Sequence, residues 1–262
     1  MKIQYASDLH LEFSDNSMFF LKNPLNVTGD ILILAGDIHV FDHPEFLQDQ
    51  FWDWASKNYK QVIIAFGNHE FYRGYDLSQM KDGFKYKIRD NVYYYYNCVL
   101  NFDETDIIIS TLWSYIPKGR EYACEHGVND FRLIKYGNKI LNSSIFNDEH
   151  EKCLKFIKKS LNESKAFNKI IVTHHVPSNL LNAEEYKDSE INGAFTVDLT
   201  DYIKTCGAKY WIFGHSHRNI NKDIGNTKCV CNQFGYFLYG ENFSFNNSAF
   251  IDLTNEEKIN EK

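Results

Sequence analysis

The sequence predicts an α/β fold in which helices cover β-sheets. Apolar, β-rich runs recur along the chain and end abruptly in polar residues, and helical stretches separate several of these runs. The last third of the chain lacks such separating stretches, which favours a second sheet packed on the first. With 44% hydrophobic and 24% charged residues, the 262-residue chain has a globular composition, unlike disordered chains, collagens or coiled coils.

Six runs rich in apolar and β-branched residues are predicted to be strands. In chain order they cover residues 3–6, 31–35, 62–66, 107–109, 170–172 and 210–213. Runs that are apolar throughout are typical of strands buried on both faces of an α/β sheet. Ligands of such sheets bind outside the carboxyl ends of the strands. We therefore expect the polar residues that follow the six runs to lie on one rim.

Two helices are predicted between the strands. The first is expected to begin at Pro44 and to extend through Trp54. The second is expected to follow an N-cap at Asp148 and to extend to Leu161. In the last third of the chain, antiparallel strands are expected at residues 228–231, 236–239 and 249–253.

The organisation of the chain predicts one domain over residues 1–262, because the sequence has no internal repeat, charge block or Pro/Gly/Ser-rich linker. No run approaches the roughly 18 apolar residues of a membrane span, and the first residues do not resemble a signal peptide. We therefore expect a cytoplasmic protein with no membrane partner. The net charge of -7, without a basic stripe, argues against long nucleic acid as a partner.

Oxygen and imidazole donors follow five of the predicted strands. They form the motifs Asp8-x-His10, Gly36-Asp37, Gly67-Asn68-His69, Thr173-His174-His175 and Gly214-His215-x-His217. One such motif alone is more typical of a solvated loop than of a binding site. Five motifs at the same end of successive strands do not fit that interpretation, and together they supply enough donors for two metal ions.

In residue type and order, these motifs resemble those of the calcineurin-like metallophosphoesterases. The resemblance extends over residues 3–217, and Asn232 followed by Gly235-Tyr236 resembles the strand end that closes many small bacterial members. It implies an αββα sandwich of two mixed β-sheets flanked by helices, with a binuclear metal site. In the implied assignment one ion is held by Asp8, His10 and His217, the other by Asn68, His174 and His215, and Asp37 bridges them.

The chemistry of these donors agrees with the implied assignment. A carboxylate can bridge two ions through its two oxygens, whereas neutral imidazole cannot, so an aspartate suits the shared position. Because Asn68 is neutral, two divalent ions, two carboxylates and a hydroxide leave a net charge of roughly +1, which attracts phosphate. Nitrogen and oxygen donors without thiolate accept manganese, iron or zinc. We expect two divalent metal ions, with manganese favoured.

His69 directly follows Asn68 and resembles the general acid of the family. The resemblance implies that a hydroxide bridging the two ions attacks phosphorus in line, while His69 protonates the leaving oxygen. Many members read Gly-Asp-x-x-Asp, and in the protein phosphatases the second aspartate orients the catalytic histidine. Val40 occupies that position here. Either Glu70 or another carboxylate orients His69, or His69 acts less strongly.

Other polar residues near the motifs are assigned no metal. In the His-His-Pro-Pro version of the family motif the first histidine is the ligand, so His174 is assigned and His175 is expected behind it. His39 and His43 are expected in a solvated loop. Residues 114–132 are expected to form a loop-rich wall of the substrate pocket. Candidate contacts in that segment are Asn129, Asp130 and Arg132.

The sequence thus predicts a metal-dependent phosphoesterase that hydrolyses a phosphodiester or a small phosphomonoester. The Asp-Arg-Gly extension of serine/threonine protein phosphatases is absent, which argues against a phosphoprotein substrate. Two alternatives stay open: a nuclease, against which the low basicity argues, and a catalytically silent scaffold that binds a protein partner. Such scaffolds lose ligands or the acid histidine, whereas this chain keeps them. The oligomeric state is not predicted.

Overall fold

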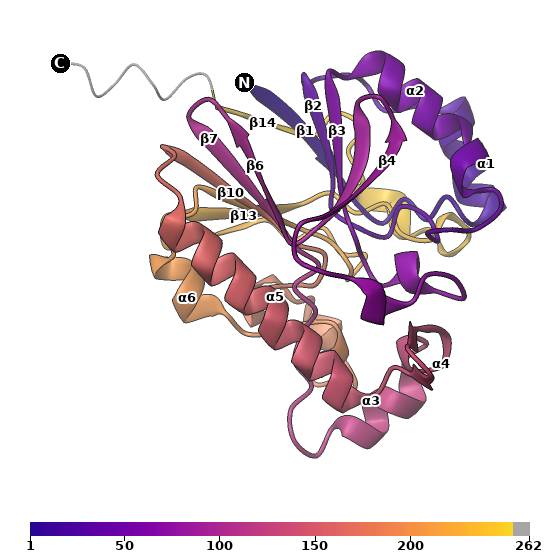
Figure 1. Cartoon of the computed structure of the whole chain (residues 1–262), viewed down its shortest axis with the longest axis vertical. Helices are drawn as coiled ribbons and strands as arrows, with labels where there is room; N and C mark the ends of the chain where they lie inside the picture. Colours follow the sequence, from indigo (N-terminus) through magenta and orange to yellow (C-terminus); the bar gives the residue numbers. More distant parts are fainter. Residues whose placement is uncertain (254–262) are drawn as a thin grey trace.

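The computed structural model describes residues 1–253 and contains two six-stranded β-sheets packed against each other (Figure 1). The strand order of the first sheet is β14 (Phe250–Asp252), β1 (Lys2–Ala6), β2 (Ile31–Leu34), β3 (Gln61–Ala65), β5 (Val92–Tyr96) and β4 (Phe84–Arg89). The order of the second is β12 (Lys222–Ile224), β13 (Thr227–Cys231), β11 (Tyr210–Phe213), β10 (Asn168–Val172), β7 (Thr105–Ile109) and β6 (Cys98–Phe102).

Both sheets are mixed. The inner pairs of each sheet are parallel, and the outermost pair at each edge is antiparallel. All six apolar runs of the sequence form strands, and helices flank the two sheets. The predicted αββα sandwich is therefore confirmed.

Alternation along the strands explains why the runs are apolar throughout. In β2, Ile31 and Ile33 pack in the layer between the sheets, whereas Leu32 and Leu34 pack in the layer beneath the helices. Successive side chains of a strand point to opposite faces, so a strand between two covered faces buries every side chain. The two hydrophobic layers thus come from the same short segments.

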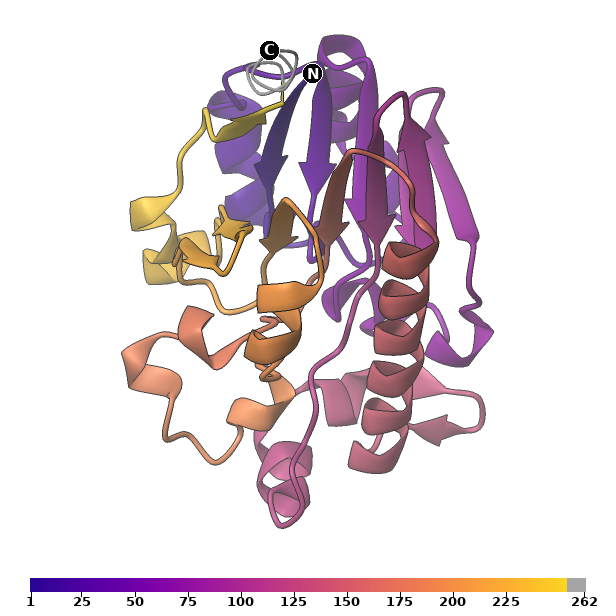
Figure 2. The same ribbon diagram turned by 90° about the vertical axis from the view of Figure 1, so that its left-hand side faces the viewer.

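Four helices cover the outer faces of the sheets (Figures 1 and 2). The first sheet is covered by α1 (Ser14–Lys22) and α2 (Gln50–Asn58), and the second by α5 (Ser143–Glu163) and α6 (Thr200–Thr205). The segment before α5 holds α3 (Glu121–Gly127), α4 (Asp130–Leu133), β8 (Lys135–Tyr136) and β9 (Lys139–Ile140). Within residues 1–253, none of the helices combines the length and apolar character needed to cross a membrane.

The first predicted helix begins later than expected. Pro44 does not open it, because residues Phe46–Gln48 form a separate 3₁₀ turn. Helix α2 begins after Asp49, whose carboxylate accepts a hydrogen bond of 2.8 Å from the backbone N–H of Phe51. The N-cap, rather than the proline, sets this boundary.

The second predicted helix begins earlier than expected. Asp148 is not its N-cap but lies inside α5. The cap is Asn142, whose side-chain oxygen accepts a hydrogen bond of 3.0 Å from the backbone N–H of Ile145. Asparagine and aspartate cap helices about equally well, so the sequence offered two similar starting points.

The last third of the chain does not form the second sheet by itself, contrary to the prediction. The first strand of that sheet along the chain is β6, well before the last third. Within the last third, β13 pairs in parallel with β11 and antiparallel with β12. Residues 236–239 are not a strand but contain a 3₁₀ turn, in which Leu238 and Tyr239 are 73% and 80% exposed. The strand predicted at 249–253 is present as β14, which pairs antiparallel with β1 in the first sheet.

Candidate metal centre

The carboxyl ends of parallel strands from both sheets meet at one rim, and the loops that follow carry all seven predicted metal ligands. Figure 2 shows the parallel strands of the first sheet running toward the same end of the molecule. From the first sheet, β1, β2 and β3 lead to Asp8, His10, Asp37 and Asn68. From the second sheet, β10 and β11 lead to His174, His215 and His217.

Donor atoms of these residues and of His69 form three overlapping clusters, within each of which they lie no more than 4.8 Å apart. The clusters are Asp8–His10–His217, His10–Asp37–His69 and Asp37–His174–His215. The side-chain oxygen of Asn68 adjoins the third cluster, 3.0 Å from His174 Nε2. The two oxygens of Asp37 face opposite ways, with Oδ1 3.3 Å from His174 Nε2 and Oδ2 3.9 Å from His10 Nε2. Asp37 therefore lies between the two predicted ligand sets.

The hydrogen bonds of the histidine rings make the first set suitable for a cation. Nδ1 of His10 lies 3.2 Å from a Glu12 oxygen, and Nδ1 of His217 lies 2.6 Å from a Glu241 oxygen. A carboxylate only accepts hydrogen bonds, so each Nδ1 carries the proton. In the neutral rings, Nε2 of His10 and of His217 are then both acceptors, and they face each other at 3.0 Å. Two facing acceptors fit an intervening metal ion.

The second ligand set also presents hydrogen-bond acceptors to one place. His174 Nδ1 lies 2.9 Å from the carbonyl oxygen of Ala35, which fixes a proton on that nitrogen. In the neutral ring, Nε2 is then an acceptor that faces Asp37 Oδ1, the Asn68 side-chain oxygen and, at 3.1 Å, His215 Nδ1. The residues present therefore fit a second metal ion of the type that nitrogen and oxygen donors bind.

Backbone strain is concentrated in these loops. Five of the seven predicted ligands have positive φ, a conformation that costs a non-glycine residue roughly 1–3 kcal/mol. They are Asp8 (56°), His10 (47°), Asp37 (55°), His215 (78°) and His217 (51°). This conformation turns the chain sharply at the strand end and directs the side chains toward one point. Such strain is typical of functional sites.

Glycines next to the ligands allow loops from different strands to approach closely. A Cβ atom at Gly36 would lie 2.5 Å from the ring of His174, and one at Gly214 would lie 2.7 Å from a carboxylate oxygen of Asp8. Gly36 comes from the first sheet and His174 from the second, and the reverse holds for the other pair. The glycine of each motif thus makes room for a donor of another motif.

Charge within the rim favours bound cations. Burial alone would raise the pKa of Asp37, but the neighbouring histidines, His174 foremost, lower that pKa well below its ordinary value. Burial would likewise lower the pKa of His217, but Asp8 and Glu241 raise it to about 10. Without a cation this ring therefore holds a second proton, which a bound metal ion would replace to leave the neutral ring described above. Burial and His174 lower the pKa of His215 to about 3. Ionised carboxylates beside buried imidazoles form an environment that holds positive charge.

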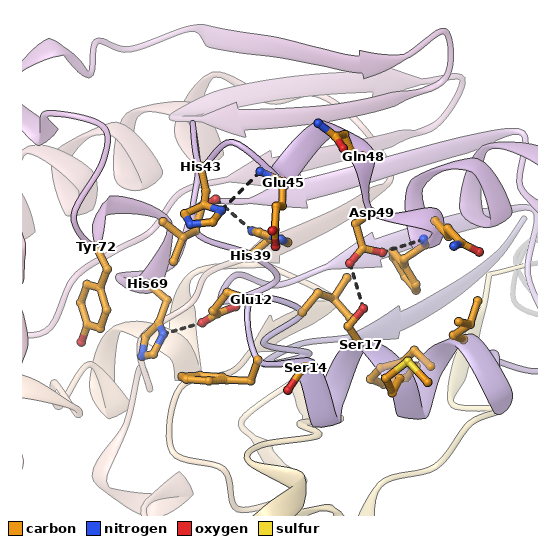
Figure 3. A pocket seen from close by; sticks show the side chains of 18 of the residues that line it. Glu12, Ser14, Ser17, His39, His43, Glu45, Gln48, Asp49, His69 and Tyr72 are labelled. Carbon is orange, nitrogen blue, oxygen red and sulfur yellow. Dashed lines mark hydrogen bonds and ion pairs between the residues drawn. The ribbon is translucent and has the colours of Figure 1, made fainter.

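Glu12 is the carboxylate that contacts His69, a residue that sequence reasoning missed. Its Oε1 lies 2.8 Å from Nδ1 of His69 (Figure 3). Burial would raise the pKa of Glu12, but its hydrogen bonds with His10 and His69 lower that pKa to about 2. The available signal was the spacing Asp8-x-His10-x-Glu12, which places a third polar residue on the same loop.

Glu70, the alternative that the sequence suggested, has another set of partners. Its carboxylate accepts hydrogen bonds from the backbone N–H groups of Asp37, Ile38 and Gly67, at 3.0, 2.9 and 2.7 Å. It therefore ties the loop after β2 to the loop after β3, and the contact with His69 Nδ1 is made by Glu12 instead.

The segment 114–132 contributes Asp130 to the site. Asp130 Oδ1 accepts hydrogen bonds from the Asn68 amide at 2.8 Å and from the Tyr72 hydroxyl at 2.6 Å. These bonds fix the amide so that its oxygen faces His174. Asn129 lines the cavity above the rim, whereas the Arg132 guanidinium donates a hydrogen bond to the backbone oxygen of His126 in α3.

His175, the second histidine of the Thr173-His174-His175 motif, lies behind the rim. Both ring nitrogens of His175 are buried without a hydrogen-bond partner among the described residues, and its ring packs 4.2 Å from that of His215. His39 and His43 are outside the clusters and line an adjoining cleft, with His39 buried rather than solvated as expected (Figure 3).

Comparisons with known proteins show the family and the fold of the chain. The family model of the calcineurin-like phosphoesterases matches residues 1–219. An uncharacterized protein of Acanthamoeba polyphaga mimivirus is 30% identical over 277 residues, covering 96% of both chains. The crystal structure of phosphopantetheinyl hydrolase from Mycobacterium tuberculosis has a TM-score of 0.64 at 17% identity and covers 90% of this chain and 89% of its own. On this evidence the chain belongs to the calcineurin-like phosphoesterase family.

Proposed function

We propose that the protein is a binuclear metal-dependent phosphoesterase that hydrolyses a phosphodiester or a small phosphomonoester. The observation that carries this proposal is the position of Asp37 between two sets of acceptor atoms, with His69 beside it. One ion would be held by Asp8, His10 and His217 and the other by Asn68, His174 and His215, with Asp37 shared. When bound, the ions supply positive charge for the phosphoryl oxygens and lower the pKa of a water molecule.

His69 is the proposed general acid. Because Glu12 occupies Nδ1, the other ring nitrogen faces the rim, 4.0 Å from Asp37 Oδ2 and 3.2 Å from the Tyr236 hydroxyl. Burial would lower the pKa of His69, but Asp37 and the bond with Glu12 raise it above its ordinary value. A protonated imidazole in this place can donate its Nε2 proton to the leaving oxygen.

The metal requirement is tested by removal and return of metal. The protein is stripped with chelator, loaded with Mn²⁺, Zn²⁺ or Mg²⁺, and assayed on bis-p-nitrophenyl phosphate and p-nitrophenyl phosphate, with metal content measured by mass spectrometry. We expect about two ions per chain and turnover that depends on them, with Mn²⁺ most active. The ratio of the two rates selects the diester or the monoester class.

Variants locate the activity at the rim. Asp37→Ala and His215→Ala are expected to lose bound metal and turnover, because each removes a donor from a buried cluster. His126→Ala is the matched control, since His126 lies on α3 outside these clusters. An Asp37→Ala protein that retains full activity would refute the proposed site. A wild-type protein that binds no metal and hydrolyses neither ester would support the scaffold alternative instead.

A further inference from the structure

A cleft of about 930 Å³ opens beside His69 and is distinct from the smaller cavity, of about 340 Å³, above the metal-ligand candidates. Four residues line both and mark the junction: His69, Tyr72, Asn129 and Tyr236. Figure 3 shows the cleft extending from His69 and Tyr72 to Ser17 and Asp49. The larger space is therefore continuous with the proposed reaction site.

One wall of the cleft is apolar. It is formed by Phe13, Met18 and Leu21 at and within α1, and by Phe51 and Trp54 of α2. Met18 and Leu21 are 46% and 51% exposed although both are large apolar residues. Exposed apolar side chains that line a concave surface are typical of sites that bind apolar groups.

The polar groups of the cleft disfavour negative charge. Its carboxylates are Glu12, Glu45 and Asp49. Among the described residues that line it there is no lysine, and Arg73 is exposed to solvent, which weakens its field. The proposed protonated imidazole of His69 is already paired with Glu12, so an anionic group in this cleft would face Glu45 and Asp49 without a further buried cation to compensate them.

The direction of His69 connects the cleft to the reaction. Its Nδ1 is bound to Glu12, so only Nε2 is free to reach a substrate, and Nε2 points to the junction beside Tyr236. A phosphoryl group above the metal-ligand candidates would present its leaving oxygen there. The remainder of the leaving group would then extend into the cleft.

We propose that the cleft binds the leaving group and that this group is an extended, mainly apolar alcohol without negative charge; the proposal rests on the phosphoesterase function proposed above. In the hydrolysis, the P–O bond to the alcohol breaks and its oxygen receives the proton from His69. The oxygen of water forms the new P–O bond and releases a proton to solvent, and His69 is protonated again from water. Alcohols that carry a carboxylate or a further phosphate are excluded by the acidic lining.

Binding of unreactive phosphonates tests the proposal apart from turnover. Methyl-, octyl-, aminooctyl- and carboxyoctylphosphonate are titrated into the Mn²⁺-loaded protein, and tryptophan fluorescence is recorded. Trp54 reports on the cleft because it lines it, whereas the other three tryptophans of the chain are fully buried and do not. We expect octylphosphonate to bind at least tenfold tighter than methylphosphonate, and carboxyoctylphosphonate at least tenfold weaker than the octyl compound. Trp54→Phe should remove the signal.

A charge placed on the apolar wall provides the matched variant. Leu21→Glu should weaken octylphosphonate binding at least tenfold relative to methylphosphonate, while aminooctylphosphonate loses less. Phe167→Glu, which also replaces an apolar side chain by a carboxylate but at a 58% exposed position outside both cavities, should leave all affinities unchanged. Equal affinities for the methyl and octyl compounds, together with turnover of bis-p-nitrophenyl phosphate, would overturn this proposal alone. Loss of both turnover and phosphonate binding would overturn the proposed function, and this proposal with it.

Discussion

Glu12 connects the proposed general acid to a proposed metal ligand. The same carboxylate oxygen lies 2.8 Å from His69 Nδ1 and 3.2 Å from His10 Nδ1. The resemblance to the protein phosphatases implies an orienting aspartate three residues after Asp37, and Val40 stands at that place here. Glu12 reaches the histidine from the loop after β1 instead, so an orienting carboxylate is present although its place in the sequence differs.

Replacement of this carboxylate should weaken the acid without removing it. Glu12→Gln keeps an acceptor oxygen for His69 but removes the negative charge that helps to raise the pKa of the ring. The pKa of His69 should fall, so the alkaline limb of kcat moves to lower pH, and turnover of alkyl esters falls about 10- to 100-fold. Esters of p-nitrophenol, which need little protonation of the leaving oxygen, should be affected much less. The measurement is the pH profile of both ester types.

His69→Ala provides the reference for that experiment. It should retain bound metal and show the same selective loss on alkyl esters, with a larger magnitude. If Glu12→Gln slows both ester types equally, or loses metal, then the carboxylate acts through His10 and not through His69.

That the candidate donors meet at one rim was predictable, because each of them lies in a short polar motif at a strand end. The contribution of Glu12 was not, since its partner His69 is 57 residues away and the two meet only because β1, β2 and β3 lie side by side in the first sheet. The same holds for Asp130, which reaches Asn68 from a segment 62 residues later. Local motifs identify donors, but the residues that orient them depend on tertiary contacts.

At the scale of elements, we predict that the N-cap residue Asn142 determines where α5 begins. Asn142→Ala removes the side-chain acceptor for the backbone N–H of Ile145 and should lower the free energy of unfolding by about 1 kcal/mol. Urea denaturation measures the change, and metal-dependent turnover should persist. Asp148→Ala is the control, because Asp148 lies inside the helix and should cost clearly less. Equal losses for the two variants would show that the cap does not determine the start of α5.

Strands were more predictable than helix boundaries or turns. A run that is apolar on both faces has few alternatives to a buried strand, and all six such runs are strands. Helix starts depend on which of several capping residues has its backbone donors within reach, as Asn142 and Asp148 illustrate. Residues 236–239 have a β-rich composition. In the structure the Tyr236 hydroxyl lies beside His69, and the residues that follow are exposed in a turn. Composition alone does not reveal that function of the loop.

At the scale of the whole molecule, the metal-ligand candidates come from both sheets, which links metal binding to the stability of the fold. Asp8, His10, Asp37 and Asn68 come from the first sheet, and His174, His215 and His217 from the second. Each proposed ion would therefore contact both sheets, since one set joins Asp8 to His217 and the other joins Asn68 to His174. An ion that binds the folded rim and not the unfolded chain stabilises the packing of one sheet on the other.

Metal should accordingly raise the melting temperature of the whole protein and not only permit turnover. At a free Mn²⁺ concentration about 100-fold above Kd, the expected rise in Tm is about 5 to 10 °C. Calorimetry of chelated and Mn²⁺-loaded protein measures it, and hydrogen exchange should show protection at the carboxyl ends of both β1 and β10. Asp37→Ala removes the donor shared by the two sets, so its Tm should not respond to Mn²⁺. Protection confined to one sheet would contradict ions that are shared between the two.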